Sequence, residues 1–204
     1  MRQVTGSNPT ATDKNVSIQL RLDGHSFSAD TLPAEVAEDS VVVVELLTAK
    51  SVLVPEECFA PEVAGRLLWL SGVPCTEKEL PVWSSVKDGV VVVMALNREI
   101  KEVLDASYGS RIKYSSPMLR GRAGEGRYLY VYVAGNVAYF KFFDGTKLAL
   151  CEAASIVGED DILCMVENVL REFNAQESVI RVAGEDIEGV IKLLKQYHKV
   201  EKCE

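Results

Sequence analysis

Few residues in this sequence have types and spacing that could do chemistry, and the most obvious group is a run of three acids, Glu159-Asp160-Asp161. Magnesium is commonly held by carboxylates, so this run could be a magnesium site. It also opens a predicted helix over 160–173, where acids in the first turn usually complement the helix dipole. We favour the helix-dipole interpretation and assign no metal ligand.

The histidines and cysteines form no recognisable centre. His25 lies in a predicted hairpin and His198 near the C-terminus, which leaves no histidine-based catalytic triad or metal cluster. The five cysteines are scattered without a CxxC pair, so we expect reduced structural thiols in a cytosolic compartment. No GxGxxG, GxxxxGK(S/T) or GxSxG motif occurs. We therefore assign no catalytic residue.

The composition excludes several classes of function. The 204 residues include 48% hydrophobic and 25% charged side chains, with a net charge of -8. This balance is ordinary for a globular protein and argues against binding to nucleic acid or an anionic membrane. The N-terminus lacks the apolar core of a signal peptide, and no apolar run approaches the roughly 18 residues needed to cross a bilayer. We expect a cytoplasmic protein without membrane insertion.

The stretch 127–155 predicts an antiparallel meander. Its three apolar, β-rich runs are separated by Gly135-Asn136 and Asp144-Gly145, and these residue types tolerate the positive φ of two-residue hairpin turns. A helix over 160–173, a strand over 179–183, a helix over 185–197 and a strand over 200–203 follow. This order predicts an α/β fold.

The first half predicts further strands and helices in a less regular series. We expect 41–47 to pair with 51–54 across a turn, and 71–89 to be an irregular loop in which Trp83 packs on the core rather than serving as a binding aromatic. The segment 120–126 has the composition of a flexible link; its arginines could bind an anion, but a solvated hinge is favoured. The remaining expected elements are strands over 16–22, 25–29, 90–96 and 112–114, a helix over 55–72 with an apolar stripe of Val63, Leu67 and Leu70, and a helix capped by Asn97.

Two segments of the chain look alike. In both 90–113 and 178–202 a strand ends in alanine, a helix ends at tyrosine, and a short apolar and basic strand follows. Each half also begins with a predicted hairpin that has glycine in its turn, at Gly24 and Gly135. We therefore predict a duplication, with a disordered tail over 1–15, a first lobe over 16–122, a second lobe over 127–204 and a cleft between the lobes.

A duplicated lobe of meander, helix, strand, helix and strand resembles the actin-like ATPase superfamily. The segment 127–155 is similar to the second phosphate hairpin of its pilus-assembly and cell-division members, and SVIRVAGEDIEGVIKLLKQY to their adenosine segment. SIQLRLDGHSFS and VLVPEECF further resemble a bacterial family of unknown function with an actin-like fold. The resemblance implies a two-lobe actin-like (ribonuclease H-like) fold. Its first lobe is trimmed, because 29–40 is too short for the strand and helix expected there.

The resemblance also implies where a nucleotide would bind and how far that site has changed. In the superfamily, each phosphate hairpin carries a magnesium-holding aspartate two residues before its glycine, and here those positions are Leu22 and Val133. Asp23 is displaced by one residue, which turns a strand side chain to the opposite face. Glu185 replaces a glycine of the adenosine segment and would crowd the ribose. The positions that would line a retained cleft are Asp23, Gly24, Ser26, Gly135, Asn136 and Gly184.

Two hypotheses follow from these residues. The first is a degenerate actin-like module, a pseudo-ATPase scaffold that contacts another protein and uses no cofactor. The second is an ATPase or kinase that binds ATP and magnesium through non-standard ligands such as Asp23, Ser26 and Asn136. The loss of both aspartates and of the glycine favours the first hypothesis. The sequence indicates neither the identity of the protein partner nor the oligomeric state.

Overall fold

The computed structural model describes residues 15–21, 36–37, 39–121 and 124–203. The chain divides into two compact units. The first unit contains the described residues up to Leu47 together with Val54–Ser116, and the second contains Thr48–Leu53 together with the chain from Pro117 onward. The predicted hairpin at Asp23-Gly24 and the strand expected over 25–29 lie outside the described residues.

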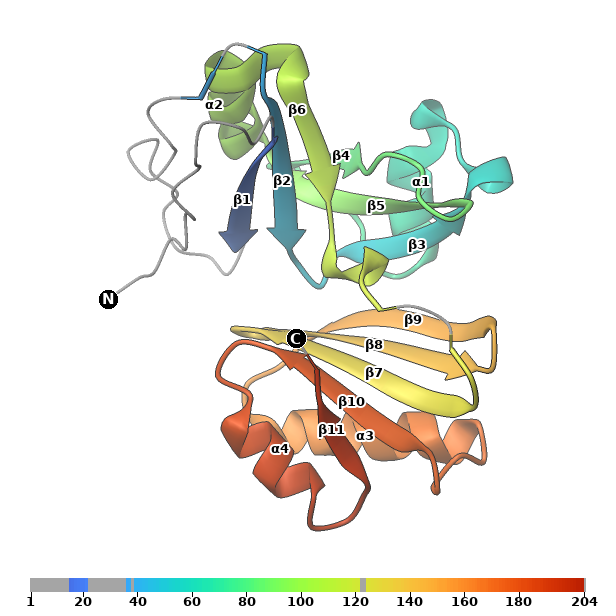
Figure 1. Cartoon of the computed structure of the whole chain (residues 1–204). Coiled ribbons are helices and arrows are strands. Elements are labelled where there is room, and N and C mark those ends of the chain that lie inside the picture. Colours follow the sequence, from blue (N-terminus) through green and yellow to red (C-terminus); the bar gives the residue numbers. More distant parts are fainter. Residues whose placement is uncertain (1–14, 22–35, 38, 122–123, 204) are drawn as a thin grey trace. The chain divides into compact units, whose positions relative to one another are not determined.

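The first unit contains a three-stranded parallel sheet in the order β1-β2-β6 (Figure 1). Its strands are β1 (Asn15–Arg21), β2 (Val41–Leu47) and β6 (Ile112–Ser115). The side chains of Val42, Val44 and Leu46 in the central strand β2 are fully buried, as its unbroken β-branched sequence predicted.

A second sheet of three strands, in the order β3-β5-β4, corrects two of the expectations. β3 (Ser51–Pro55) lies beside β5 (Val90–Asn97) and not beside β2, because β2 already has a parallel neighbour on each side. The predicted loop over 71–89 contains β4 (Glu79–Trp83), which pairs antiparallel with β5. Pro81 is compatible with this strand because β4 lies at the edge of the sheet, where a missing backbone N–H costs no ladder hydrogen bond.

The first helix of the first unit lies where the sequence predicted it, but the side chains that it buries differ from the predicted ones. Two single 3-10 turns, η2 (Glu56–Cys58) and η3 (Pro61–Val63), precede α1 (Ala64–Leu70). α1 buries Ala64 and Leu68 and leaves Leu70 exposed, so the stripe expected from Val63, Leu67 and Leu70 is wrong by one position.

The second helix of the first unit, α2 (Arg98–Tyr108), begins at the predicted cap. The Asn97 side-chain oxygen accepts hydrogen bonds from the backbone N–H groups of Glu99 at 2.8 Å and Ile100 at 3.4 Å. The side chain of Leu104 is fully buried.

The second unit contains a five-stranded sheet in the order β11-β10-β7-β8-β9. The predicted meander is present as β7 (Arg127–Ala134), β8 (Val137–Asp144) and β9 (Lys147–Ser155), which are antiparallel to one another. β10 (Val179–Gly184) and β11 (Val200–Lys202) extend the sheet in parallel with β7.

Both hairpin turns of the meander begin with a glycine in the left-handed region. Gly135 has a φ of 60° and Gly145 a φ of 61°, as expected for the first central position of a type II′ turn. Asp144 pairs with Lys147, so the second turn consists of Gly145-Thr146 rather than the predicted Asp144-Gly145.

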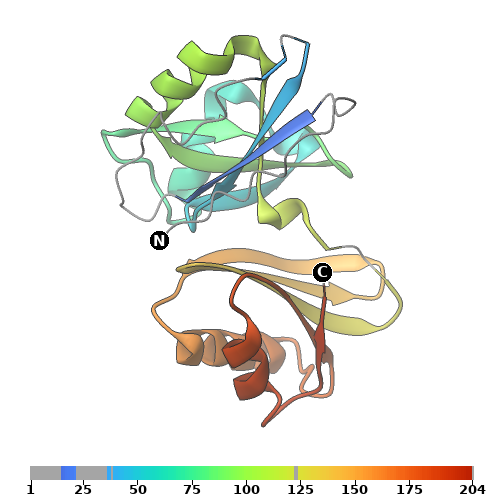
Figure 2. The ribbon, with the colours of Figure 1, turned by 60° about the vertical axis from the view of Figure 1, so that its left-hand side comes forward.

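Two helices, α3 (Glu159–Glu172) and α4 (Glu188–Leu194), cover one face of the five-stranded sheet (Figures 1 and 2). The helical spacing of Ile162, Val166, Val169, Leu170 and Phe173 predicts one apolar face for α3. This prediction is confirmed, because Ile162, Val166 and Leu170 are buried against the sheet. Within the described part of the chain, no helix is long and apolar enough to cross a membrane.

The two similar sequence segments do not occupy equivalent places in the two units. In the second segment, β10 and β11 are parallel neighbours in one sheet. In the first segment, β5 and β6 belong to different sheets. The matching arrangement is instead β1-β2-β6 in the first unit and β7-β10-β11 in the second, each parallel and each with its second strand in the middle.

The packing of α3 on the sheet yields a first prediction. Leu170→Ala should lower the free energy of unfolding by about 2–5 kcal/mol, because it opens a cavity in a fully buried cluster. Chemical denaturation measures this change. Leu70→Ala removes the same atoms from an exposed position and should cost less than about 0.5 kcal/mol. An equally small effect of Leu170→Ala would show that this face of α3 is solvated.

The end of β10 yields a second prediction. Gly184 has a φ of 120°, and a Cβ added there would lie 2.7 Å from the backbone nitrogen of Val133 and would overlap the Val133 carbonyl oxygen. Gly184→Ala should therefore separate β10 from β7 and lower the melting temperature more than Gly126→Ala. Gly126 has a φ of 82° and nothing within 4 Å of the added Cβ, so it isolates the cost of backbone conformation alone. Equal effects of the two variants would mean that β7 moves away from the added Cβ at little cost in stability.

Candidate functional site

A depression of about 360 Å³ lies in the second unit, where three segments meet. These segments are the β7–β8 turn, the chain that enters α3, and the chain that leaves β10. The residues that line it are Val133, Gly135, Asn136, Ile156, Val157, Gly158, Glu159, Ile162, Glu185, Asp186 and Val190.

The structure brings together the predicted site residues of the second half. Gly135 and Asn136 line the depression, and Gly184 ends β10 directly before Glu185, which also lines it. Of the other predicted positions, Asp23, Gly24 and Ser26 lie outside the described residues. Sequence reasoning did not assign Glu159 and Asp186 to this place; Glu159 had been noted only as an acid at the start of a helix.

Backbone hydrogen bonds hold the three segments in position. The N–H of Glu185 donates to the Val133 carbonyl at 2.9 Å, and the N–H of Ile156 donates to the Asn136 carbonyl at 2.8 Å. The first bond requires the close approach of Gly184 to β7. The positions of Asn136 and Glu185 are therefore set by the sheet itself.

The charge around the depression is negative. Glu159, Glu185 and Asp186 line it, and none of the described residues that line it is basic. The carboxylate of Glu159 lies against Gly189, whose added Cβ would come within 2.7 Å of the Glu159 Cδ. A phosphate placed here would meet carboxylates of the same sign.

The two backbone amides directly before α3 are engaged by the chain's own acid. The Asp161 carboxylate accepts hydrogen bonds from the N–H groups of Val157 at 2.7 Å and Gly158 at 3.3 Å. This confirms the interpretation of the acidic run as a helix-terminus feature. Among the described residues, no group of three or more His, Cys, Asp or Glu side chains is arranged to hold a metal ion.

Val133 occupies the position two residues before the turn glycine, where the resemblance implies an aspartate. Its side chain is 5% exposed and belongs to the apolar cluster beneath α3 and α4. An apolar side chain in this cluster offers no oxygen to a hydrated cation. The equivalent position in the first half, Leu22, lies outside the described residues.

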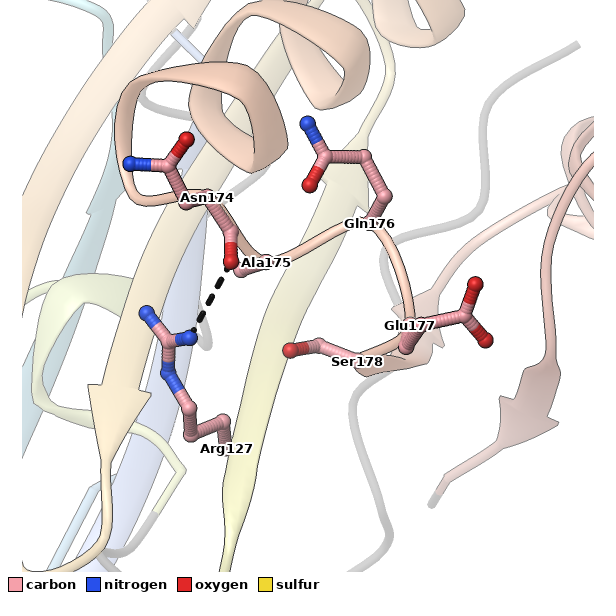
Figure 3. A pocket seen from close by; sticks show the side chains of 6 residues that line it. All are labelled: Arg127, Asn174, Ala175, Gln176, Glu177 and Ser178. Carbon is pink, nitrogen blue, oxygen red and sulfur yellow. Dashed lines mark hydrogen bonds between the residues drawn. The ribbon is translucent and has the colours of Figure 1, made fainter.

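A second depression of about 330 Å³ lies at the opposite end of α3, around Arg127 (Figure 3). The Arg127 guanidinium donates to the carbonyls of Phe173 at 2.6 Å and Asn174 at 3.2 Å, and its Nε lies 3.4 Å from the Asp144 carboxylate. Arg127 thus binds the carbonyls of the C-cap residue of α3 and of the residue after it, and Figure 3 shows Glu177 pointing away from it. This arrangement is a helix cap and offers no free cation for an anion.

Arg120 was expected in a solvated hinge and instead packs on the second-unit sheet. Its guanidinium lies 4.6 Å from the centre of the Tyr132 ring, and its carbonyl accepts a 2.6 Å hydrogen bond from the Lys141 ammonium. These contacts place Arg120 within an aromatic and cationic layer rather than at a mobile link.

Other reactive side chains show no sign of activation. Burial raises the pKa of the Cys151 thiol to about 11, despite the opposing effect of Lys141, so this thiol is protonated at neutral pH and is a poor nucleophile. Burial likewise raises the pKa of Tyr114 to about 12. The His198 ring lies 2.7 Å from the Glu167 carboxylate, and this is a pairing of two residues rather than a triad.

Comparisons with known proteins identify the fold. No protein-family model and no curated protein matches the sequence. A solved structure from Bacteroides thetaiotaomicron, described as a protein with an actin-like ATPase fold and unknown function, matches 79% of this chain and 68% of its own chain. Its TM-score is 0.67 and its sequence identity is 16%.

Two further solved structures are similar at lower TM-scores. The PilM–PilN type IV pilus biogenesis complex matches with a TM-score of 0.49 and 17% identity, over 80% of this chain and 69% of the matched chain. The cytoplasmic domain of EpsL, an inner-membrane component of the Vibrio cholerae type II secretion system, matches with a TM-score of 0.48 and 12% identity, over 93% of this chain and 89% of its own. The match to the Bacteroides thetaiotaomicron structure, with its TM-score of 0.67, confirms at the level of the fold the resemblance drawn from the sequence. The chain has a mixed α/β, actin-like ATPase fold.

Proposed function

We propose that this chain is a degenerate actin-like module that acts by contacting another protein and does not hydrolyse ATP. The observation that supports this proposal is the lining of the depression in the second unit. Its charged side chains are Glu159, Glu185 and Asp186, and no described basic side chain joins them. The phosphates of a nucleotide carry the same sign of charge as this lining.

The electrostatic cost of a phosphate in this place is considerable. Two like charges 4 Å apart repel by about 1 kcal/mol in water and about 4 kcal/mol near a protein surface. Magnesium could offset this repulsion only if oxygen ligands held it in near-octahedral geometry beside the phosphates. Val133 supplies no such oxygen, and the Glu159 carboxylate is packed on Gly189.

If the depression binds neither magnesium nor phosphate, we infer that this actin-like fold acts by contacting another protein. The state of the cysteines supports a reducing compartment, because none of the five forms a disulfide. We therefore place the proposed contact in the cytoplasm. The alternative, an ATPase or kinase with non-standard ligands, has Asn136 as its single described candidate ligand.

A third prediction tests the proposal directly. Isothermal titration calorimetry of the unmodified protein with Mg-ATP and with Mg-ADP should detect no dissociation constant below about 100 µM, which corresponds to roughly −5.5 kcal/mol. A thermal-shift series gives an independent readout. At millimolar ATP, a micromolar site would stabilise the native state by roughly 4 kcal/mol. A saturable, magnesium-dependent binding isotherm would contradict the proposal.

A fourth prediction concerns Val133→Asp, which restores the carboxylate that the resemblance implies. The variant should not regain ATP binding and should be less stable than Val133→Ala, because it places a carboxylate in an apolar cluster. Burial raises the folded-state pKa of such a group above its unfolded value of about 3.9. The extra loss of stability should therefore grow as the pH rises above 4 and shrink below it. Denaturation at several pH values measures this, and a fully stable Val133→Asp would show that the position faces water.

A further inference from the structure

One strand of the second-unit sheet leaves a long edge open. β9 lies at the end of the order β11-β10-β7-β8-β9 and pairs only with β8 (Figure 1). Its nine residues make it the longest of the edge strands in the described part of the chain. The strand at the opposite edge, β11, has three residues, and a short edge strand is one way in which proteins prevent further strand pairing.

The part of β9 that is available for pairing is the regular run 150–155, which we call the β9 edge. The register with β8 shifts by one residue at Ala149, which forms a β-bulge, and is unbroken after it. Lys147 lies before the bulge. The β9 edge itself contains no proline and no lysine, and its single charged residue is Glu152. It therefore lacks the residues that usually protect an exposed edge strand.

Three residues of the β9 edge direct their backbone groups away from the sheet. The N–H of Ile156, which follows the edge, donates to the Asn136 carbonyl at 2.8 Å and so points toward β8. In an antiparallel pair the direction of the N–H and C=O groups reverses at each residue. The groups of Ser155, Ala153 and Cys151 therefore point outward, and no other described residue makes a backbone hydrogen bond to them.

A row of outward donors and acceptors is a template for a further strand. The side chains do not obstruct such a strand, because Ala153, Ala154 and Ser155 are small. The apolar core also extends to this edge: Leu150 and Ala154 are partly buried and pack against the cluster beneath α3 and α4. A strand added here would satisfy the outward backbone groups and cover these two side chains.

We propose that the β9 edge pairs antiparallel with the β9 edge of a second copy of this chain, which joins the two five-stranded sheets. A second copy brings a strand that is already formed, so pairing costs less conformational entropy than ordering an extended peptide. An antiparallel pair of identical strands is two-fold symmetric, so each contact is made twice. The inference goes beyond the proposed function and does not rest on it, because no residue of β9 lines the depression.

The charges select one register for this pair. Residues directly opposite each other must lie on the same face of the joined sheet. A two-fold axis at Glu152 would place the carboxylates of the two copies opposite each other, which is destabilising. An axis at Ala153 instead places Glu152 opposite the second copy's Ala154, and Cys151 opposite the second copy's Ser155. The outward groups of both copies then meet, and each such pair exchanges both N–H···O bonds.

Size-exclusion chromatography with light scattering over a concentration series tests the association. The mass of the full chain should rise from monomer toward dimer with concentration, and more so in added salt, because the net charge of -8 on each copy opposes approach. Ala153→Pro should raise the dissociation constant of the dimer about tenfold or more, because it removes an outward N–H that β8 does not use. Ala153→Gly keeps this N–H and is the matched control.

Disulfide cross-linking tests the register. With the axis at Ala153, the Cα atoms of this residue in the two copies lie about 5.5 Å apart, a distance that a disulfide spans. Ala153→Cys should therefore form a covalent dimer under mild oxidation. Ala149→Cys, at an exposed position of the same strand, should not, because about eight residues of strand, or about 26 Å, separate its two copies. Peptide mass spectrometry distinguishes this disulfide from those of the five native cysteines.

Three results would overturn the inference. The first is a monomer at every concentration and salt, which would leave the β9 edge to an extended segment of another protein. The second is a dimer that Ala153→Pro and Ala153→Gly affect equally, and the third is equal cross-linking of the two cysteine variants. Circular dichroism checks that each variant is folded, and if Ala153→Pro is not, the cross-linking decides. The nucleotide calorimetry is independent of these measurements, so either result can fail without the other.

Discussion

The second unit depends on the close contact of β10 with β7 at Gly184. Because Gly184 has no side chain, the Glu185 N–H reaches the Val133 carbonyl at 2.9 Å, and β7 gains a parallel neighbour in addition to β8. Every residue of β7 after Arg127 is buried as a result of its central place in the sheet. The same contact delivers Glu185 and Asp186 to the depression beside the β7–β8 turn. One strand pairing therefore determines both the core of this unit and the charge of its candidate site.

The features that the sequence predicted correctly are those decided by nearby residues. The meander follows from glycine at the turns, the cap of α2 from Asn97, and the buried face of α3 from its helical spacing. The features it missed depend on which strands become neighbours. β2 has a parallel partner on both sides, so β3 joins another sheet. Pro81 made the segment of the edge strand β4 look like a loop in the sequence. A buried strand followed by an amphipathic helix also has the same sequence pattern in either sheet, so the similarity of 90–113 to 178–202 did not reveal that β5 and β6 belong to different sheets.

The candidate site was predictable in part, for the same reason. The local motif located Gly135, Asn136 and Gly184 at the ends of two strands, and the structure places these strand ends together. The contribution of Glu159 was not predictable, because the start of its helix lies beside the turn through the pairing of β9 with β8 and the Ile156–Asn136 hydrogen bond. The three-dimensional structure shows that the depression is negatively charged, because carboxylates from two separate segments line it. It also shows that the Val133 side chain is part of the apolar core. These residues argue against nucleotide binding more strongly than the altered motif does by itself.

The central claim is that the second-unit depression does not accept a nucleotide, and residue-resolved NMR tests it most directly. Gly135, Asn136 and Glu185 line the depression and Gly184 directly precedes Glu185, so the backbone amides of these four residues report on it. On addition of millimolar Mg-ATP, the account predicts that these amide resonances keep their positions. A saturating shift confined to these four amides would show that the phosphates or ribose bind there, and would contradict the account.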